Sequence, residues 1–320
     1  MDRIEKIRSG DVRTASRLIR DLEDEFPQAV SAIKELYPYT GQARVLGLTG
    51  APGAGKSTLT DGILEALRKK TKSVGVLAVD PSSPYTGGAI LGDRIRMQRH
   101  AEDPGVFIRS LATRGALGGI SKAVGDSIHV FDSMGKEFVI IETVGIGQQE
   151  VEIMNYAHTV IVVLVPGMGD GVQTIKAGVM EIADIFVINK ADRDGADTLA
   201  AEINLMLDMA APDPQAWRTP VVKIGNVINN LEFRQGIDEL LEHLDKHFQY
   251  LQNSGEIRQK LQNKALFEIK AALNNNINKV IYEQLVNDGT LEAMIEKMIE
   301  RSSDAYTLSE IVTSKYLKNV

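Results

Sequence analysis

The central part of the chain alternates short apolar runs with segments of helical length, and no other feature constrains its fold as strongly. Several runs consist almost wholly of Val, Ile and Leu, which is typical of strands buried on both faces of a parallel sheet. Repeated strand-then-helix units predict an α/β fold with a mostly parallel, doubly wound sheet, which binds ligands beyond the carboxyl ends of its strands. The expected strands are Arg44–Thr49, Ser73–Val79, Val106–Arg109, Phe138–Glu142, Thr159–Val165, Ile185–Asn189 and Val221–Ile224. The expected helices between them are Lys56–Lys69, Gly119–Met134, Gly171–Ile182 and Gly195–Met209.

Both ends of the chain show helical patterns without strand signals. Apolar residues recur at helical spacing over residues 3–36, and over residues 256–285 they recur at every fourth position. A turn at residues 287–290 precedes a second expected helix, Leu291–Arg301. We therefore expect an N-terminal helical extension (1–42), a sheet domain (43–253) and a C-terminal helical arm (254–320). Either the arm's own domain or a second subunit could cover its apolar face.

A glycine-rich segment between the first strand and the first helix of the sheet domain matches the pattern G-x-x-x-x-G-K-[ST]. In such a loop the backbone N–H groups point at a phosphate, next to the N-terminus of a helix. Lys56 is expected to bridge the β- and γ-phosphates, and Ser57 to offer its hydroxyl to Mg²⁺. The segment therefore predicts a nucleotide-binding phosphate loop, made of Gly50, Ala51, Pro52, Gly53, Ala54, Gly55, Lys56, Ser57 and Thr58.

A second motif, Asn189-Lys190-Ala191-Asp192, follows the apolar run that ends at Ile188 and has the N-K-x-D pattern of GTPases. The Asp192 carboxylate can accept hydrogen bonds from both N1–H and the N2 amine of guanine. Adenine presents an acceptor at N1 and has no amine at that place, so it would leave the carboxylate unpaired. A site built in this way rejects the wrong base by orders of magnitude. The motif therefore predicts guanine specificity.

Acidic residues at two strand ends are the candidates for the metal site. Glu142 ends the run Phe138–Glu142 and is followed by Gly145, where GTPases commonly read D-x-x-G. Glu142 is expected to hold Mg²⁺ through a water, and the Gly145 N–H to sense the γ-phosphate. Asp80 and Asp93 flank a Gly-, Ser- and Pro-rich stretch, and we expect them to act on the metal or on water. The predicted metal set is Ser57, Asp80, Asp93 and Glu142, and the predicted catalytic set is Lys56, Asp93, Glu142 and Gly145.

The composition excludes several classes of protein. With Lys+Arg 36 against Asp+Glu 43, the net charge of −7 argues against nonspecific attraction to nucleic acid or to anionic membranes. No Cys is present, which excludes disulfides, a thiolate metal site and a cysteine nucleophile. The N-terminal segment is charged, and no apolar run reaches the length of a membrane span. We expect a cytoplasmic protein.

Taken together, these segments and the helical flanks closely resemble the MeaB/ArgK family, which includes human MMAA. The likeness covers nearly the whole chain, from GDVRTASRLIRDLE near the N-terminus to the helices after residue 236. Members are GTPases of the SIMIBI class that act as chaperones of adenosylcobalamin-dependent acyl-CoA mutases, chiefly methylmalonyl-CoA mutase. The resemblance implies homodimers joined by the C-terminal helices, and GTP hydrolysis that gates cofactor loading, protection or rescue of the mutase. It also implies that the segment Pro166–Lys176, with Asp170, Gln173 and Lys176, answers to the partner enzyme. No cobalamin site is expected on this chain, and whether a cobalamin adenosyltransferase joins the complex is left open.

The chain departs from its relatives at the segment after the seventh strand. Relatives usually carry a Ser-Ala pair there, against the guanine O6, whereas this chain has Gly225, Asn226 and Val227. We expect backbone N–H groups of these residues to serve the base. The segment Asn226–Gln235 also looks longer than usual, which predicts an extended loop.

The catalytic machinery also differs from that of Ras-like GTPases, which orient the attacking water with a Gln directly after the switch glycine. Ile146 holds that place, so we expect slow GTP hydrolysis by the isolated protein and stimulation by a partner. No residue stands out as an arginine finger among Arg94, Arg96, Arg99, Arg109 and Arg114.

Two alternative functions stay open. A P-loop kinase or ATPase would share the phosphate loop but needs no N-K-x-D motif. A GTP-gated scaffold without a mutase partner would need nucleotide binding but not hydrolysis. A nickel-inserting GTPase of the same class would carry Cys or His ligands, and this chain has no Cys and no cluster among its five His.

Overall fold

The computed structural model describes residues 2–80, 98–100, 102–112, 122–143, 149–167, 181–210, 213 and 215–316. For residues 80, 98, 122, 149 and 150 it describes the backbone only. The chain divides into two compact units, Met1–Lys264 and Ala265–Val320. Across the described ranges, no helix contains a stretch long and apolar enough to cross a membrane.

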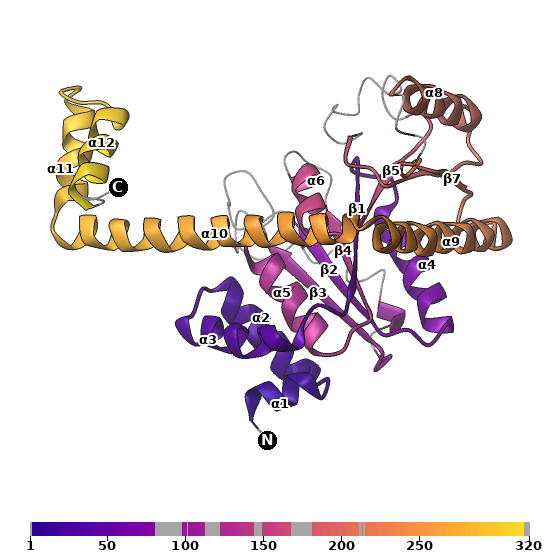
Figure 1. The fold of residues 1–320 in the computed structure, drawn as a ribbon, viewed down its shortest axis with the longest axis horizontal. Helices are drawn as coiled ribbons and strands as arrows, with labels where there is room; N and C mark the ends of the chain where they lie inside the picture. The colour runs from indigo at the N-terminus through magenta and orange to yellow at the C-terminus, as the bar shows by residue number, and fades with distance from the viewer. Residues whose placement is uncertain are drawn as a thin grey trace. The chain divides into compact units, whose positions relative to one another are not determined.

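In the first unit, the described residues form one seven-stranded sheet in the order β3-β2-β4-β1-β5-β6-β7, and every neighbouring pair is parallel (Figure 1). The prediction of a mostly parallel α/β sheet is thus confirmed. The connection that leaves β1 runs to one side of the sheet, towards β2, whereas the connection that leaves β5 runs to the other side, towards β6. The carboxyl end of β1 therefore lies at a switch point, where such sheets bind ligands. The strands are β1 (Arg44–Gly50), β2 (Val74–Asp80), β3 (Val106–Ala112), β4 (Phe138–Thr143), β5 (Thr159–Leu164), β6 (Ile185–Asn189) and β7 (Val221–Ile224).

Helices pack on both faces of the sheet. On one face, α4 and α9 bury a hydrophobic core against the strands, with Leu64 and Leu240 fully buried in it. On the other face, two strand glycines let helices approach: an added Cβ on Gly75 would lie 2.1 Å from Phe131 of α5, and one on Gly47 2.7 Å from Ile153 of η4. The helices among the described residues of this unit are α1 (Arg3–Arg8), α2 (Val12–Glu23), α3 (Pro27–Leu36), η1 (Tyr37–Tyr39), α4 (Lys56–Lys69), η3 (Gln98–His100), α5 (Lys122–Ser133), α6 (Gln149–Glu152), η4 (Ile153–Asn155), α8 (Ala196–Met209) and α9 (Asn230–Ser254).

The N-terminal helices pack on the sheet domain through α5 (Figure 1). The apolar side chains of α2 at helical spacing, including Leu18, Ile19 and Leu22, are buried, which explains the helical pattern of the sequence. The chain then enters β1 through residues 41–43, whose backbone N–H groups all donate to the carboxylate of Asp132 on α5. The extension is therefore attached to the sheet domain by both apolar packing and hydrogen bonds.

Helix α10 (Glu256–Asn287) begins in the first unit and continues into the second, where α11 (Thr290–Ile299) and α12 (Ala305–Tyr316) follow. Asp288 links the helices of the second unit. Its carboxylate accepts hydrogen bonds from the backbone N–H of Thr290, at the start of α11, and from the side chains of Lys315 and Tyr316 of α12. These hydrogen bonds, that of Thr290 foremost, lower the pKa of Asp288 far below its usual value. Helix α12 was not expected from the sequence, in which its short apolar pattern is weak.

The segment after β7 differs from the expectation. Residues 226–235 were expected to form an extended loop, but α9 begins at Asn230, so Asn230–Gln235 is helical. The reason is that Phe233 and Ile237, four residues apart, are buried against α4. The connection between β7 and α9 is therefore short.

Candidate functional site

The predicted phosphate loop lies between β1, which ends at Gly50, and α4, which begins at Lys56. Three of its glycines adopt positive φ angles: Gly50 142°, Gly53 79° and Gly55 89°. A Cβ on Gly50 would lie 2.2 Å from the carbonyl oxygen of Val163 on β5, and one on Gly55 2.3 Å from Nδ2 of Asn189. The loop conformation therefore needs glycine at these places, both for backbone freedom and for space.

Lys56 begins α4 with its side chain folded over the loop. Its Nζ donates to the carbonyl oxygens of Gly50, at 2.8 Å, and Ala51, at 3.1 Å, and the residue is only 6% exposed. The ammonium group of Lys56 therefore lies at the phosphate loop, where phosphate oxygens of a nucleotide are expected to replace these carbonyl oxygens as its partners. That Lys56 serves phosphates rather than the core stays a prediction.

Glu142 lies at the centre of the buried polar cluster beside the loop. The Ser57 hydroxyl donates to Glu142 Oε1 at 2.5 Å, and the Thr60 hydroxyl donates to Oε2 at 2.8 Å. Glu142 is 4% exposed and lies on β4, next to β1 in the sheet. Thr60 was missed from the sequence, although its position three residues after Ser57 in a helix places the two on one face.

The N-K-x-D segment, which follows β6, contacts the phosphate loop. Asn189 ends β6, and its Nδ2 donates to the Ala54 carbonyl at 2.8 Å. Lys190, in the left-handed backbone region with φ 55°, extends its Nζ to the Gly53 carbonyl at 3.1 Å. Two side chains of this motif thus contact two consecutive residues of the loop.

Asp192 and the segment Gly225–Val227 lie at the same edge of the sheet. Residue Asn189 of β6 pairs with Ile224 of β7, and the Ala191 N–H donates to the Ile224 carbonyl at 2.9 Å. Asp192 is exposed, and within the described part of the chain its carboxylate has no hydrogen-bond partner. The fold therefore brings the predicted base-binding residues together beside the phosphate loop.

Several predicted site residues lie outside the described residues. They are Asp93 and Gly145 of the predicted catalytic set, and Asp170, Gln173 and Lys176 of the partner-coupling segment. The backbone of Asp80 is described as the last residue of β2, beside β4. Over the described residues, no group of three or more His, Asp and Glu side chains is placed to hold a metal.

Two of the five arginine-finger candidates are engaged elsewhere. Arg99 pairs with Asp61 and Glu65 on α4, and Arg109 donates to Glu23 of α2 at 2.7 Å. Arg94, Arg96 and Arg114 lie outside the described residues. The described arginines of this set thus hold structural segments together.

Comparison with known proteins places this site in a family. The family model described as "Methylmalonyl Co-A mutase-associated GTPase MeaB" matches residues 15–285. A protein of Pyrococcus abyssi that carries the name "Putative GTPase" is 46% identical over 98% of this chain and 96% of its own length. The GTPase ArgK of Escherichia coli is 32% identical over 98% of this chain and 96% of its own length. The "methylmalonic aciduria type A homolog, mitochondrial" of Caenorhabditis elegans is 32% identical over 68% of this chain and 54% of its own length.

Among solved structures, that of an LAO/AO transport system kinase has a TM-score of 0.69 over 99% of this chain and 97% of that one. At 24% identity this likeness shows the shared fold only. With a family model that spans most of the chain and relatives of high coverage, the chain belongs to the MeaB family of P-loop GTPases.

Proposed function

We propose that this protein binds GTP at the phosphate loop and the N-K-x-D segment, and hydrolyses it to assist an adenosylcobalamin-dependent acyl-CoA mutase. The observation that carries the nucleotide part is the contact of Asn189 and Lys190 with Ala54 and Gly53. It brings a candidate guanine-binding segment against a candidate phosphate-binding one. A kinase or ATPase would need no such pairing.

Magnesium fits the oxygen donors of the polar cluster. Mg²⁺ prefers hydroxyl, carboxylate and water oxygens, and Ser57 and Glu142 bring a hydroxyl and a carboxylate together beside the loop. In this proposal these two residues hold the ion, and Thr60 keeps the carboxylate oriented. When bound, Mg²⁺ would neutralise charge on the β- and γ-phosphates. Asp80 and Asp93 stay predicted members of the metal set.

Guanine recognition is assigned to Asp192 and the segment Gly225–Val227. The exposed carboxylate of Asp192 is open to N1–H and N2 of a base. Gly225, Asn226 and Val227 would meet O6 with backbone N–H groups, in place of the Ser-Ala pair of relatives. An Asp192→Asn variant tests this assignment, because its amide donates where guanine also donates but complements the O2 of xanthine. We expect GDP affinity to fall and xanthosine diphosphate affinity to rise in calorimetry. An unchanged preference for GDP would refute the role of Asp192.

Hydrolysis is proposed to be slow without a partner. Water attacks the γ-phosphorus, the bond from that phosphorus to the β,γ-bridging oxygen breaks, and GDP and phosphate leave. Lys56 would stabilise the charge on the phosphates, and Asp93 or Glu142 would orient the water, since Ile146 cannot. Gly145 would donate its N–H to the γ-phosphate.

A mutase partner is supported by the description of the family and by the printed name of the Caenorhabditis elegans relative. We place the response to that partner in residues 166–176, through Asp170, Gln173 and Lys176. The assay is GTP turnover with and without an adenosylcobalamin-dependent methylmalonyl-CoA mutase, and we expect acceleration by the mutase. Lys176→Ala should keep the slow rate and lose most of the acceleration. Equal rates in a confirmed complex of the mutase and the unmodified protein would instead support the scaffold function.

A homodimer joined by the C-terminal arm is part of the proposal. Apolar side chains along α10 are about half exposed, including Leu266 at 52%, Ile269 at 57% and Leu273 at 54%. Exposed apolar stripes of this kind commonly mark protein interfaces. The second unit buries Leu285, Leu308 and Val312 among its own helices, and the stripe on α10 is left for a partner arm.

A further inference from the structure

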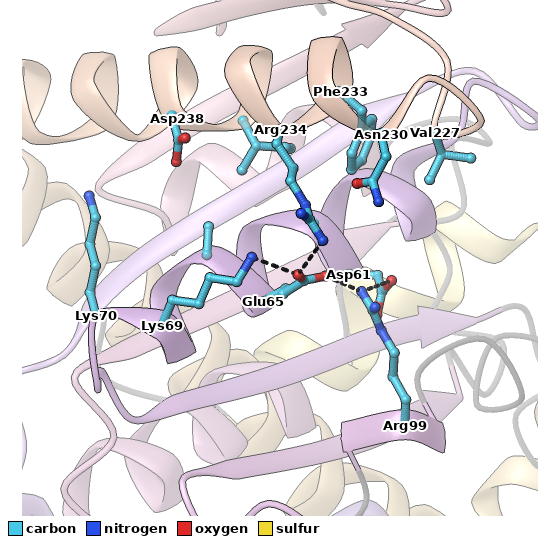
Figure 2. Close-up of a pocket in the computed structure, with 13 residues that line it drawn as sticks. Asp61, Glu65, Lys69, Lys70, Arg99, Val227, Asn230, Phe233, Arg234 and Asp238 are labelled. Atoms are coloured by element: carbon cyan, nitrogen blue, oxygen red, sulfur yellow. Dashed lines mark hydrogen bonds and ion pairs between the residues drawn. The ribbon is translucent and has the colours of Figure 1, made fainter.

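Figure 2 shows an ion network in the first unit that joins α4 to α9 and η3. Asp61 accepts from Arg99 of η3 through Nε at 3.0 Å and Nη2 at 2.5 Å. Nε2 of His100, the next residue of η3, lies 3.0 Å from the same carboxylate. Two consecutive residues of η3 therefore contact one side chain of α4.

Glu65 extends the network to α9. Its carboxylate lies 2.9 Å from Nη2 of Arg99, 2.8 Å from Nζ of Lys69 and 3.6 Å from Nη2 of Arg234. The hydrogen bond from Lys69, together with the charge of Arg99, lowers the pKa of Glu65 despite its partial burial. Arg234 lies in the second turn of α9, soon after the proposed base-binding segment. The network surrounds part of a cavity of about 330 Å³ between α4, α9 and η3.

The network follows the same side of α4 as the proposed metal ligand. Ser57, Asp61, Glu65 and Lys69 succeed one another at steps of four, which places each above the last along a helix. Asp61 thus holds η3 one turn behind Ser57, and it directly follows Thr60, which holds Glu142. Between Asp61 and Glu65, Gly62 lets α9 approach so closely that an added Cβ would lie 2.8 Å from Phe233.

Stability alone does not account for this arrangement. The side chains of Arg99 and Arg234 are 51% and 55% exposed, and ion pairs with such exposed partners stabilise a fold only weakly. A fork of two hydrogen bonds from one guanidinium, however, fixes geometry as well as distance. The fork between Arg99 and Asp61 therefore fixes η3 against the part of α4 that carries Ser57 and Thr60.

We propose that Asp61 and Arg99 are positioning residues for GTP hydrolysis, which they serve by holding η3 on α4 directly behind Ser57. The inference rests on the proposed function, because it assigns a role within the same site. It separates Arg99 from the arginine-finger role: Arg99 acts through Asp61 and does not touch the nucleotide. Loss of either partner should therefore lower kcat, while GDP affinity, which depends on the loop and the base segment, stays unchanged.

The test compares Asp61→Ala, Arg99→Ala, Arg99→Lys and the double variant Asp61→Ala/Arg99→Ala in the full chain. Misplacing a catalytic group by about 1 Å costs up to about 100-fold in rate, so we expect each alanine variant to lose at least about tenfold in kcat. The loss in the double variant should be smaller than the product of the two single losses, because both single variants remove the shared interaction between Asp61 and Arg99. Arg99→Lys, which can still pair with Asp61, should recover part of the rate. Lys72→Ala, which breaks the exposed pair of Lys72 with Glu137 on the same unit, is the control and should keep full kcat.

Each other outcome decides against the inference. If Arg99→Ala is slow but Asp61→Ala keeps full kcat, Arg99 does not act through Asp61 and the positioning role of the pair is wrong. If GDP affinity falls together with kcat, or the losses add in the double variant, the pair does not act as a unit on hydrolysis. If the alanine variants keep kcat while the unmodified protein binds guanine nucleotide and hydrolyses GTP, the inference fails alone. Absence of guanine-nucleotide binding by the unmodified protein would overturn the proposed function itself.

Discussion

Replacing Gly55 by alanine should disturb the contact between the phosphate loop and the base segment. Gly55 has φ 89°, and an added Cβ would lie 2.3 Å from Nδ2 of Asn189, which donates to Ala54. Forcing an L-residue into this backbone region costs about 1–2 kcal/mol of stability. Displacing Asn189 from its partner costs roughly a further 1–3 kcal/mol. We expect this second part to appear as a loss of GDP affinity of roughly five- to 150-fold.

Gly135→Ala supplies the matched control for the backbone part of this effect. Gly135 has φ 78°, and nothing lies within 4 Å of an added Cβ. Gly135→Ala should lose about 1–2 kcal/mol in urea unfolding and Gly55→Ala at least as much, and only Gly55→Ala should lose GDP affinity in calorimetry. If the two variants bind GDP equally well, the contact of Asn189 with the loop has no part in nucleotide binding and our reasoning is refuted.

Three further predictions concern the loop, the arm and pH. Lys56→Ala should weaken GDP binding roughly 10- to 150-fold and leave the fold intact by circular dichroism, since its partners are loop carbonyls; an unchanged Kd in calorimetry would contradict this. A chain that ends at Lys264 should bind GDP and be monomeric in light scattering, whereas the full chain should be dimeric; a monomeric full chain would exclude the proposed dimer. The pKa of His158 is lowered from 6.5 to about 4 by burial and nearby positive charges, while its Nδ1 accepts from the Val45 N–H. Because the unfolded chain binds a proton there at higher pH, stability should fall by up to about 3 kcal/mol from pH 6.5 to pH 4, and urea unfolding should show a flatter slope in His158→Gln.

Much of the fold was predictable because its pattern is local. Continuous apolar runs separated by helical segments indicated the parallel sheet, and β6 and β7 have the bounds expected from the sequence. The start of α9 was not predictable in this way. Its first turns carry few apolar residues, and Phe233 is held there by packing on α4 rather than by helical propensity.

The residues of the candidate site likewise fall into those that the sequence predicted and those that only the structure revealed. The phosphate loop and the N-K-x-D segment were found because each chemistry requires given residue types at given spacings along the chain. Thr60, Asp61 and Arg99 gave no comparable signal. Each is an ordinary polar residue, and its role comes from a partner elsewhere in the chain: Thr60 and Glu142 are 82 residues apart, and Asp61 and Arg99 are 38 apart.

The sequence by itself determined the class of fold, the family, the phosphate loop and the segment expected to read the base. Glycines at positive φ and consecutive apolar residues act through the nearest neighbours in the chain, so their pattern carries the information. Only the tertiary structure decided which side chains meet: Asn189 with the loop, Thr60 with Glu142, and Asp61 with η3. Contacts between distant segments depend on how helices pack on the sheet, and that packing is decided by the whole core at once.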